Sequence, residues 1–532
     1  MTPESASEAR NPRRDVSFSL FIAAVVLVGL VSRLRPAAFH GDELFRSFPT
    51  EDGYLMLTVA RNLSLGLGMT HAAGSIATNG VQPLGAFLQA LAFSLTESGR
   101  EETVRLLLTF YAALAALTAF AVFRLGLVLL GNSSDARRAS ALAAAVWFAS
   151  PVAFFHTMNM LETGLYAFLV VVAVLVFARW HREGKGGPWS PGRCAVMGAL
   201  LGIAFWARND AVFLMAAIGL AHWAASTAEA SLWRRVRETE VMGVAALAIA
   251  LPWLSYNLWG FGSLMPVSGL AHLRPGALGS NLAAAAAALF EMLTLVASFE
   301  HHPVQNRPGF IAFSAALSAF AGAALSIALW RNRARRAELA AWLVPVVLGI
   351  GLLSFYVLAF DAPYFLRRYL FPVSPFLALL WAWLVVRLWR RSGSKRLGVL
   401  APFAAVALLF NFAMRDGLFL PRGPWRQHQF RGVDWIAAHV EESAWVGAFQ
   451  SGTVGFFHDR TINLDGKLNP GALAAIRAGR HAAYVIESPV QFIVDWATIV
   501  EPWYESSPEL ARHFEWVELD RARNFAVLRR RP

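Results

Sequence analysis

The sequence has few charged residues and almost no cysteine. Only 15% of its 532 residues are charged, whereas about a quarter are charged in a typical soluble protein. This composition is far outside the soluble range. The single cysteine, Cys194, excludes an intramolecular disulfide and a four-cysteine metal site. Hydrophobic residues are abundant instead, at 56% of the chain with 19 Trp and 39 Phe, and they predict a membrane protein.

Apolar runs long enough to cross a hydrocarbon core recur along most of the chain. They are continuous rather than alternating, as helical spans require. We expect about eleven spans. The first is the apolar stretch after Arg13 and Arg14, and the others lie near residues 104–130, 138–155, 164–180, 193–207, 211–226, 240–257, 309–330, 338–360, 371–389 and 397–413. Two more apolar stretches, 82–97 and 281–299, are predicted to lie at the outer surface or to re-enter the membrane.

The positive charge follows the membrane topology. A net charge of +12 could suggest nucleic-acid binding, but the basic residues cluster in short connectors such as "GNSSDARR" and "SLWRRVRE". Cytoplasmic retention of Lys and Arg produces this pattern. Although Ala37-Ala38 could form a signal-peptide cleavage site, the many spans that follow favour an uncleaved first helix. We therefore predict an inner (cytoplasmic) membrane protein with a cytoplasmic N-terminus and an extracytoplasmic C-terminus.

The chain divides into two predicted domains. Residues 1–414 form the transmembrane domain, in which 35–103 is a long first outer loop with juxtamembrane helices. Residues 415–532 form a small extracytoplasmic α/β domain. In this domain "WVGAFQSGTVGFF" predicts a strand and a Gly-rich turn, "GALAAIRAG" a helix, and "AAYVIE" and "FAVLRR" strands. Its "GTVG" lacks the spacing of a nucleotide-binding fingerprint.

Acidic residues at two places in the outer segments are candidate catalytic residues. Glu51 and Asp52 follow Thr50, so they could simply stabilise a helix start that Thr50 caps. Glu162 begins an apolar run, where Asn159 or Thr163 could instead be capping the next helix. An ionisable group at membrane depth is nevertheless a functional-site hypothesis by default.

Outward-facing arginines are the second kind of candidate. Arg208 and Asp210 share a tight turn, where a mutual salt bridge is the simpler interpretation. Arg367 and Arg368 lie on the outer side, against the positive-inside bias, and would need an anionic partner. Lipid headgroups and a substrate phosphate are both possible partners.

The order of these motifs resembles the bacterial GT-C glycosyltransferases. The motifs are "EDGYLMLTVARNLSLGLG", "TNGVQPLG", "LETGLY", "ARNDAVFL", "NLWGFGSLMPVSGLA" and "RRYLFPVSP". The similar proteins are polyprenyl-phosphate-sugar-dependent enzymes related to mycobacterial arabinofuranosyltransferases, the lipid A aminoarabinose transferase and protein O-mannosyltransferases. The resemblance covers residues 35–375, and "GFFHDRTINLDGKLNP" is similar to the soluble end of some members. It implies an all-α polytopic membrane fold of the GT-C type.

The resemblance also implies roles for individual residues. Asp52 looks like the catalytic base, with Glu51 as its acidic neighbour and Glu162 as a second outer carboxylate. Arg367 or Arg368 would contact the donor phosphate. Further positions that match the family's motifs, as phosphate-binding or supporting residues, are Arg208, Asp210, Tyr54 and Asn79. His272 departs from the motif and is a candidate replacement for a basic contact of the relatives. Many relatives carry two Asp where this chain has Glu51-Asp52, and a Lys after "P-N-T" where it has "MPVSGLAH".

The sequence therefore predicts an inverting glycosyltransferase. Its partners would be a polyprenyl-phosphate sugar donor, membrane lipids, and a cell-envelope glycan, lipid or protein acceptor, without nucleic acid. No metal-binding motif is present, although Glu162 could assist a divalent cation such as Mg or Mn. One alternative is a transporter or lipid flippase with an outward-facing charged cavity. Another is an acyl- or phospho-group transferase, for which His40, His71 and His156 would be the candidates. A purely structural membrane protein is the third.

Overall fold

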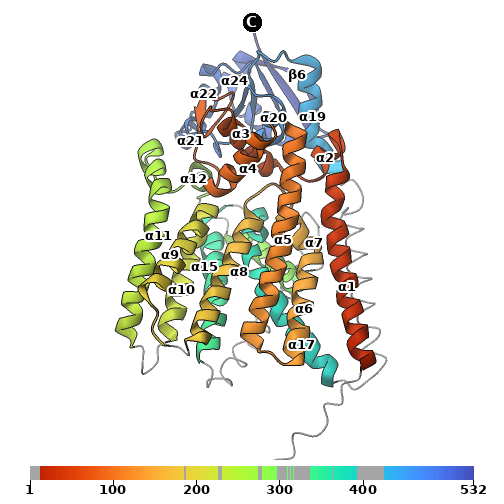
Figure 1. Cartoon of the computed structure of the whole chain (residues 1–532). Helices are drawn as coiled ribbons and strands as arrows, with labels where there is room; N and C mark the ends of the chain where they lie inside the picture. The colour runs from red at the N-terminus through yellow and green to blue at the C-terminus, as the bar shows by residue number, and fades with distance from the viewer. Residues whose placement is uncertain are drawn as a thin grey trace, which may run out of the picture.

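The computed structural model describes residues 12–184, 187–225, 231–273, 278–295, 308–309, 312, 316, 336–361, 363–391 and 424–532. Within them, long helices form a bundle, and a small α/β domain stands on one end of it (Figure 1). Six described helices are long and apolar enough to cross a membrane, or seven if one bent pair counts as a single span. The predicted fold class, a polytopic helical membrane protein with a C-terminal sheet domain, is confirmed.

The bundle helices match nine of the predicted spans. They are α1 (Pro12–Leu34), α5 (Arg100–Leu130), α6 (Ser134–Ala149), α7 (Pro151–Thr157), α8 (Thr163–Glu183), α9 (Pro191–Ala207), α10 (Val212–Ala224), α11 (Leu232–Phe261), α15 (Arg336–Ala359) and α17 (Ser374–Arg391). At 17 and 13 residues, α9 and α10 are shorter than the other spans. The remaining two predicted spans, 309–330 and 397–413, fall outside the described residues apart from isolated positions.

The span predicted at 138–155 is broken into α6 and α7, which meet at 60°. Pro151 lacks an N–H and its ring clashes with the preceding turn, so α6 ends at Ala149. Ser150 caps the new helix by accepting the Ala153 N–H at 3.2 Å, and its hydroxyl donates to the Leu295 carbonyl. The bend redirects the chain into the loop that carries Glu162.

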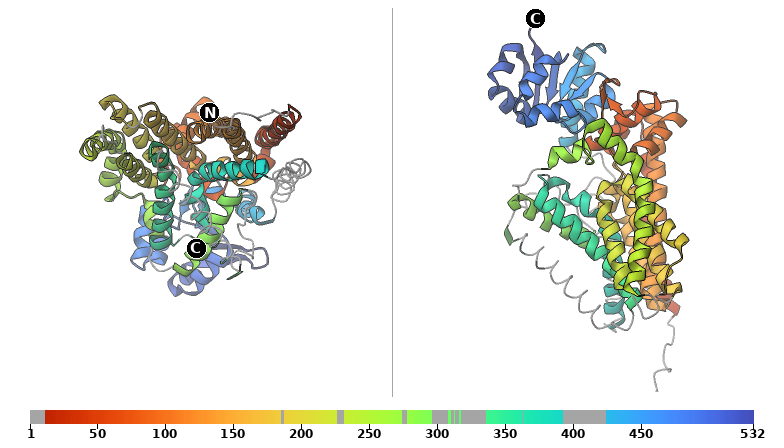
Figure 2. Two further views of the ribbon diagram at one scale, coloured as in Figure 1. Left: turned by 90° about the horizontal axis from the view of Figure 1, so that it is seen from below. Right: turned by 90° about the vertical axis from the view of Figure 1, so that its left-hand side faces the viewer.

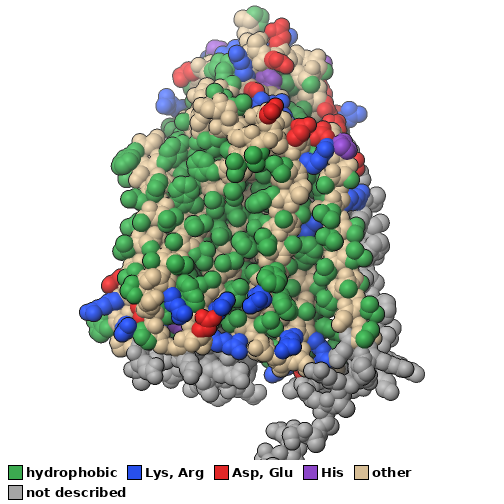
Figure 3. Space-filling view, in the orientation of Figure 1, with side chains coloured by type: hydrophobic (Ala, Val, Ile, Leu, Met, Phe, Trp, Pro, Cys, Tyr) green, Lys and Arg blue, Asp and Glu red, His purple; other side chains and the backbone are tan. Residues whose placement is uncertain are grey.

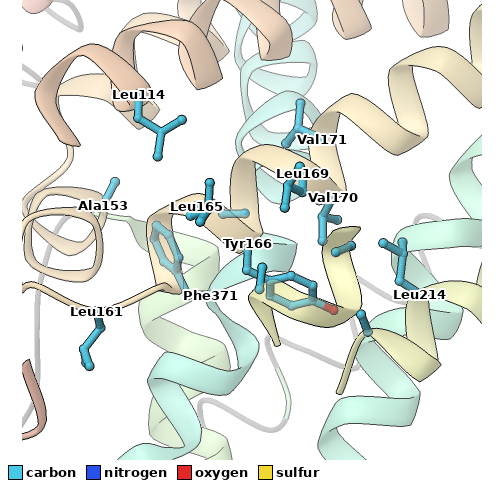
Figure 4. Packing of buried hydrophobic residues seen from close by; sticks show 14 of the residues in the cluster. Leu114, Ala153, Leu161, Leu165, Tyr166, Leu169, Val170, Val171, Leu214 and Phe371 are labelled. Atoms are coloured by element: carbon cyan, nitrogen blue, oxygen red, sulfur yellow. The ribbon is translucent and has the colours of Figure 1, made fainter. Parts of the chain in front are cut away.

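Helix α8 lies at the centre of the bundle. Figure 4 shows Tyr166 and Val170 of α8 among side chains from the neighbouring helices, such as Leu114 of α5 and Leu214 of α10. Tyr166 and Val170 are fully buried, and so is Phe371 next to α8. Because close-packed neighbours surround α8 on several sides, its N-terminal end is held firmly, and that end begins directly after Glu162.

The predicted outer loop forms small elements at one end of the bundle (Figure 1). They are α2 (Gly41–Ser47), α3 (Glu51–Ser64), the hairpin β1 (Thr70–His71) and β2 (Ile76–Ala77), and α4 (Pro83–Leu95). The apolar stretch 82–97 thus becomes a 13-residue helix packed against α3. The other non-spanning stretch becomes α13 (Leu278–Thr294), which packs against α15, α17 and the short α16 (Leu366–Leu370).

The C-terminal domain is a five-stranded mixed sheet in the order β4-β3-β5-β7-β6, flanked by helices. Its elements are α19 (Pro424–His439), β3 (Val446–Ala448), α20 (Ser451–Phe457), β4 (Thr461–Asn463), α21 (Pro470–Arg477), α22 (His481–Glu487), β5 (Phe492–Asp495), α23 (Ala497–Glu505), α24 (Pro508–His513), β6 (Phe514–Asp520) and β7 (Phe525–Arg530). Strands β4, β3 and β5 are parallel, whereas β7 pairs antiparallel with β5 and β6. The right-hand view of Figure 2 shows this domain over the end of the bundle, next to the outer-loop helices.

Two local predictions for this domain are wrong. "AAYVIE" forms the helix α22 rather than a strand, because Ala482 and Ala483 favour a helix. In this helix Val485 is fully buried, and Ala482, Tyr484 and Ile486 pack against the same core. The predicted Gly-rich turn after β3 is the short helix α20. The helix α21 and the last strand β7 are confirmed.

Charge is distributed unevenly between the two ends of the bundle. On the face shown in Figure 3, Lys and Arg side chains gather at the end opposite the C-terminal domain, and a broad hydrophobic belt separates the two ends. Many large apolar side chains of the long helices are exposed, for example Val244 at 70% and Leu247 at 54% in α11. Lipid contact accounts for such exposure.

Candidate active site

A cavity of about 530 Å³ lies at the junction of the bundle, the outer loop and the C-terminal domain. Most of its lining is apolar. Its ionisable side chains come from segments that are far apart in the sequence and are Asp52, Glu162, Arg208, Asp210, His272, Tyr356, Arg368, Tyr369 and Lys467. The structure thus brings six of the residues predicted from the sequence to one cavity: Asp52, Glu162, Arg208, Asp210, His272 and Arg368.

Asp52 stands at the first turn of α3 and faces two cations. Thr50 caps this helix by accepting the Gly53 N–H at 3.2 Å, so helix capping and a functional Asp52 coexist. A Cβ on Gly53 would lie 2.3 Å from the Asn159 carbonyl, so only glycine lets α3 pack this closely against the loop before Glu162. Arg368 donates to Asp52 Oδ2 at 2.8 Å, and Lys467 Nζ is 3.8 Å from Oδ1.

These charges set the protonation of Asp52. Burial alone raises the pKa of the Asp52 carboxyl, but the charges of Lys467 and Arg368 outweigh burial and hold its pKa below the usual range. Burial lowers the pKa of His272 to about 4, so that ring is neutral near pH 7. Asp52 is therefore an ionised acceptor between two cations.

A second charged cluster joins Glu162, Arg208, Asp210 and Tyr356 deeper in the bundle. Arg208 donates to Glu162 Oε1 at 2.7 Å and to both oxygens of Asp210, the shortest distance again being 2.7 Å. The Tyr356 hydroxyl donates to Asp210 Oδ2 at 2.8 Å. The side chains of Arg208 and its two carboxylate partners are at most 4% exposed. The predicted Arg208–Asp210 salt bridge is present, and Glu162 extends it.

Neither of the caps suggested for α8 is formed as expected. Glu162 itself occupies the N-cap position, and no side chain there caps the helix. Asn159 instead accepts the N–H of Leu161 at 3.3 Å within the preceding loop. The Glu162 carboxylate is thereby left to bind Arg208 and line the cavity.

Glu51 points away from the cavity and into the C-terminal domain. Its carboxylate accepts the backbone N–H of Gly452, and it accepts the N–H and the hydroxyl of Thr453 at 3.0 and 2.5 Å. These amides open α20, whose first-turn N–H groups have no partner within the helix. The geometry makes Glu51 a clamp between the outer loop and the C-terminal domain, not a group that touches the cavity.

Replacing Glu51 with Ala is expected to loosen this junction. The buried donors of Gly452 and Thr453 would lose their acceptor, at a cost of about 1–3 kcal/mol. Hydrogen exchange of the α20 amides should become faster in E51A than in the wild type. E51Q, which keeps one acceptor oxygen, should lie between them. Unchanged exchange in E51A would contradict the clamp.

Three other predicted residues also lie outside the cavity. Arg367 faces away from Asp52, with its Nε 2.8 Å from Glu291 Oε1 of α13. Tyr54 is buried, and its hydroxyl donates to the Phe45 carbonyl at 2.7 Å. Asn79 donates to the Asn257 side-chain oxygen at 3.0 Å and accepts the Val267 N–H at 2.9 Å. Asn79 thereby fixes the segment that leads to His272.

The histidines considered for acyl or phosphoryl chemistry do not gather at the cavity. His40 is exposed beside Glu101, whereas His71 and His156 are buried and absent from the cavity lining.

Three cavity residues were missed by the sequence reasoning, namely Lys467, Tyr356 and Tyr369. The two tyrosine rings stack at 3.7 Å, and the Arg208 guanidinium lies 5.1 Å from the Tyr369 ring. Lys467 lies in the loop after β4 of the C-terminal domain. Two signals pointed to the segment of Lys467. It lies in "GFFHDRTINLDGKLNP", which is similar to the soluble end of some family members, and it follows a buried strand, where ligand-binding loops of α/β sheets occur.

No family model matches the sequence, and no curated protein matches it either. Solved structures do match. ArnT from Cupriavidus metallidurans bound to undecaprenyl phosphate aligns with a TM-score of 0.54 and 14% identity, covering 96% of this chain and 97% of ArnT. The Archaeoglobus fulgidus oligosaccharyltransferase AglB, in complex with an inhibitory peptide and a dolichol-phosphate, aligns with a TM-score of 0.52 and 11% identity over 94% of this chain and 72% of AglB.

The chain has the GT-C fold. This agrees with the resemblance that the motif order suggests, and at these identities the likeness concerns the fold. Of the residues that line the cavity, Lys467 comes from the C-terminal domain.

The described residues do not fit a divalent metal ion. Another structure of the Archaeoglobus enzyme contains Zn and sulfate and aligns with a TM-score of 0.54 at 12% identity. In this chain Asp52, Glu162 and Asp210 each bind a guanidinium group. Among the described residues, no group of three or more His, Cys, Asp or Glu side chains could hold a metal.

We accordingly expect the purified protein to hold no tightly bound divalent metal. Its thermal unfolding temperature should be the same after treatment with excess EDTA and desalting, and added Mg or Mn should not raise it. A lower unfolding temperature after EDTA that Mg or Mn restores would contradict this prediction.

Proposed function

We propose that the protein is an integral-membrane inverting glycosyltransferase. It would move a sugar from a polyprenyl-phosphate donor to a cell-envelope glycan, lipid or protein acceptor on the outer face of the cytoplasmic membrane. The observation that carries the proposal is the pairing of an ionised acceptor, Asp52, with the Arg368 cation in a cavity between the bundle and the C-terminal domain.

Asp52 is the proposed general base. An acceptor hydroxyl attacks the anomeric carbon from the face opposite the phosphate, and its proton passes to the Asp52 carboxylate. A depressed pKa keeps this carboxylate ionised at neutral pH, which is the form that can accept a proton. General-base assistance of this kind contributes typically about 10²–10⁴-fold to the rate.

Arg368, rather than Arg367, is the proposed donor-phosphate contact. Adjacent residues of a helix point about 100° apart, and Arg367 is directed to Glu291 while Arg368 lines the cavity. A guanidinium group matches two phosphate oxygens at once and offsets the charge that develops on the leaving group.

The cluster around Arg208 is proposed to position the acceptor. Its guanidinium is bound to Glu162 and Asp210. We therefore assign Arg208 to holding Glu162 at the cavity wall instead of to direct phosphate binding. Glu162 then accepts a hydrogen bond from a hydroxyl of the incoming acceptor.

An apolar extension of the site supports a lipid-linked donor. Phe205, Val212 and Leu254 line both the charged cavity and a second, almost wholly apolar cavity of about 270 Å³ between α9, α10 and α11. A substrate with a charged head and a hydrocarbon tail suits such a pair of neighbouring spaces.

A transfer assay tests the proposal. Purified protein in lipid nanodiscs is incubated with a panel of polyprenyl-phosphate sugars and a membrane extract as the acceptor source, and release of polyprenyl phosphate is measured. At least one donor should release lipid phosphate in an acceptor-dependent manner. If no donor of the panel turns over, while the protein carries labelled lipid or solute across a sealed bilayer, a transporter replaces the glycosyltransferase.

A further inference from the structure

Lys467 belongs to the C-terminal domain, and its side chain lines the cavity next to residues of the membrane domain. Its ammonium is 3.3 Å from Asp465 Oδ2 and 3.8 Å from Asp52 Oδ1, and its side chain is only 15% exposed. Burial alone lowers the pKa of Lys467, but Asp465 and Asp52 outweigh burial and raise the pKa above the usual range. The side chain is therefore charged.

Hydrogen bonds and close packing fix the conformation of the loop that contains Lys467. Asp465 accepts the Lys467 backbone N–H at 2.9 Å, and Asn463 accepts the Leu468 N–H at 3.2 Å. From the other side, Gly80 of the outer loop approaches so closely that a Cβ there would lie 2.1 Å from the Lys467 carbonyl. The loop is thus fixed by its own hydrogen bonds and by the wall of the cavity.

We propose that Lys467 is the second cation of the donor-phosphate site and that the arriving phosphate releases Asp52 from Lys467 and Arg368. This inference rests on the proposed glycosyl transfer. In the structure the two cations are neutralised by Asp52, one on each carboxylate oxygen. A phosphate placed between them takes over both contacts, and Asp52 is then free to accept a proton. Binding of the donor thereby frees the Asp52 carboxylate to act as the general base.

The charge balance of the reaction supports two cations. The donor is a phosphodiester with one negative charge. When the acceptor oxygen bonds to the anomeric carbon, the bond from that carbon to the phosphate oxygen breaks, and its electron pair stays on the phosphate. The lipid leaves as a phosphate monoester with a second negative charge, while the proton goes to Asp52. Lys467 and Arg368 together match that dianion, so their effect is largest late in the reaction.

The charged and titratable groups around Asp52 come from several elements. Besides Lys467 and Arg368, they are Glu51 next to it in α3, His272 of α12 (Val267–His272), Asp465 of the β4 loop, Glu162, and the phenols of Tyr364 and Tyr369. With His272 neutral, Lys467 is the counter-charge of Asp52 that the C-terminal domain supplies.

The test compares K467M, K467R and the control D459N. Asp459 also joins the C-terminal domain to the outer loop, through Arg61 and Arg100, but it does not line the cavity. Binding of undecaprenyl phosphate and of its uncharged alcohol, undecaprenol, is followed by tryptophan fluorescence. K467M should bind undecaprenyl phosphate at least about tenfold more weakly and undecaprenol unchanged, since it loses one contact to a charged phosphate. K467R should recover most of the affinity, and D459N should match the wild type.

Kinetics give an independent readout. In K467M, kcat should fall by about 10²-fold, the loss expected for one preorganised charge donor, with a smaller change in KM for the donor. Loss of the Lys467 charge also raises the pKa of Asp52, so the acid limb of the rate profile should move to higher pH.

Two outcomes separate the inference from the proposed function. If K467M folds, binds undecaprenyl phosphate as tightly as the wild type and keeps its kcat, Lys467 is not a phosphate contact, although the enzyme can still be a glycosyltransferase. If the wild type itself binds undecaprenyl phosphate no better than undecaprenol and turns over no donor, the proposed function fails, and this inference with it.

Discussion

Replacing Asp52 with Asn should lower transfer by about 10²–10⁴-fold, the usual contribution of a general base. Asn keeps the shape of the side chain but cannot take a proton from the acceptor hydroxyl. Donor binding should be retained or become tighter, because the substitution leaves the Arg368 and Lys467 cations in place and removes the carboxylate that competes with the phosphate for them. The measurement is release of polyprenyl phosphate at saturating donor, together with the affinity for undecaprenyl phosphate.

Asp42 provides a matched control for this variant. It lies in the same outer loop, is 81% exposed, and pairs with Arg46 away from the cavity. D42N should keep wild-type turnover, and D52N should remain folded as judged by size-exclusion chromatography. A well-folded D52N protein with normal turnover would remove Asp52 as the base and leave Glu162 as the next candidate.

Replacing Arg208 with Met should produce the largest loss of stability. The change leaves Glu162 and Asp210 buried without their guanidinium partner. Removing one member of a buried ion pair typically costs about 3–5 kcal/mol, because the remaining charge is uncompensated. Thermal unfolding of R208M in detergent should shift to lower temperature by several degrees.

The uncharged triple variant E162Q/R208M/D210N separates charge from packing. It removes the stranded carboxylates, so it should recover much of the stability lost in R208M while remaining inactive, because Glu162 no longer positions the acceptor. If R208M unfolds at the wild-type temperature, the cluster makes no net contribution to stability and its proposed supporting role is wrong.

The sequence predicts the membrane part of the fold well, because continuous apolar runs mark the segments that are long enough to cross the lipid. Motif order also identifies Asp52, Glu162, Arg208, Asp210 and the pair Arg367-Arg368, and all of these except Arg367 line one cavity. Proximity of these residues could be expected because all of them follow or precede spans on the same predicted side.

Orientation within neighbouring pairs could not be predicted. Glu51 and Asp52 are adjacent, as are Arg367 and Arg368, and successive helical residues point in different directions. The direction each takes depends on partners that lie far away in the chain, namely Gly452 and Thr453 for Glu51 and Glu291 for Arg367. Nothing local to either pair identifies those partners.

Lys467 was missed for the same reason. A lone lysine in a loop carries no pattern of its own, and its role depends on how a separate sheet docks on the bundle. That docking is made by contacts such as Glu51 to α20 and Arg477 to the Leu270 carbonyl at 2.8 Å. Sequence periodicity indicates single helices and strands, and it does not indicate which residues form the contacts between two domains.

The late position of Lys467 in the chain affects how the protein is made. Chains emerge from the ribosome N-terminus first, and domains generally fold as units in that order. The spans can enter the bilayer, and every other residue of the cavity lining can be in place, before β4 and its loop are synthesised. The cavity is therefore incomplete throughout membrane insertion and is finished only when the final sheet docks. A chain whose synthesis stops before β4 can still insert into the membrane, but its cavity lacks Lys467. We therefore expect such truncated chains to be inactive.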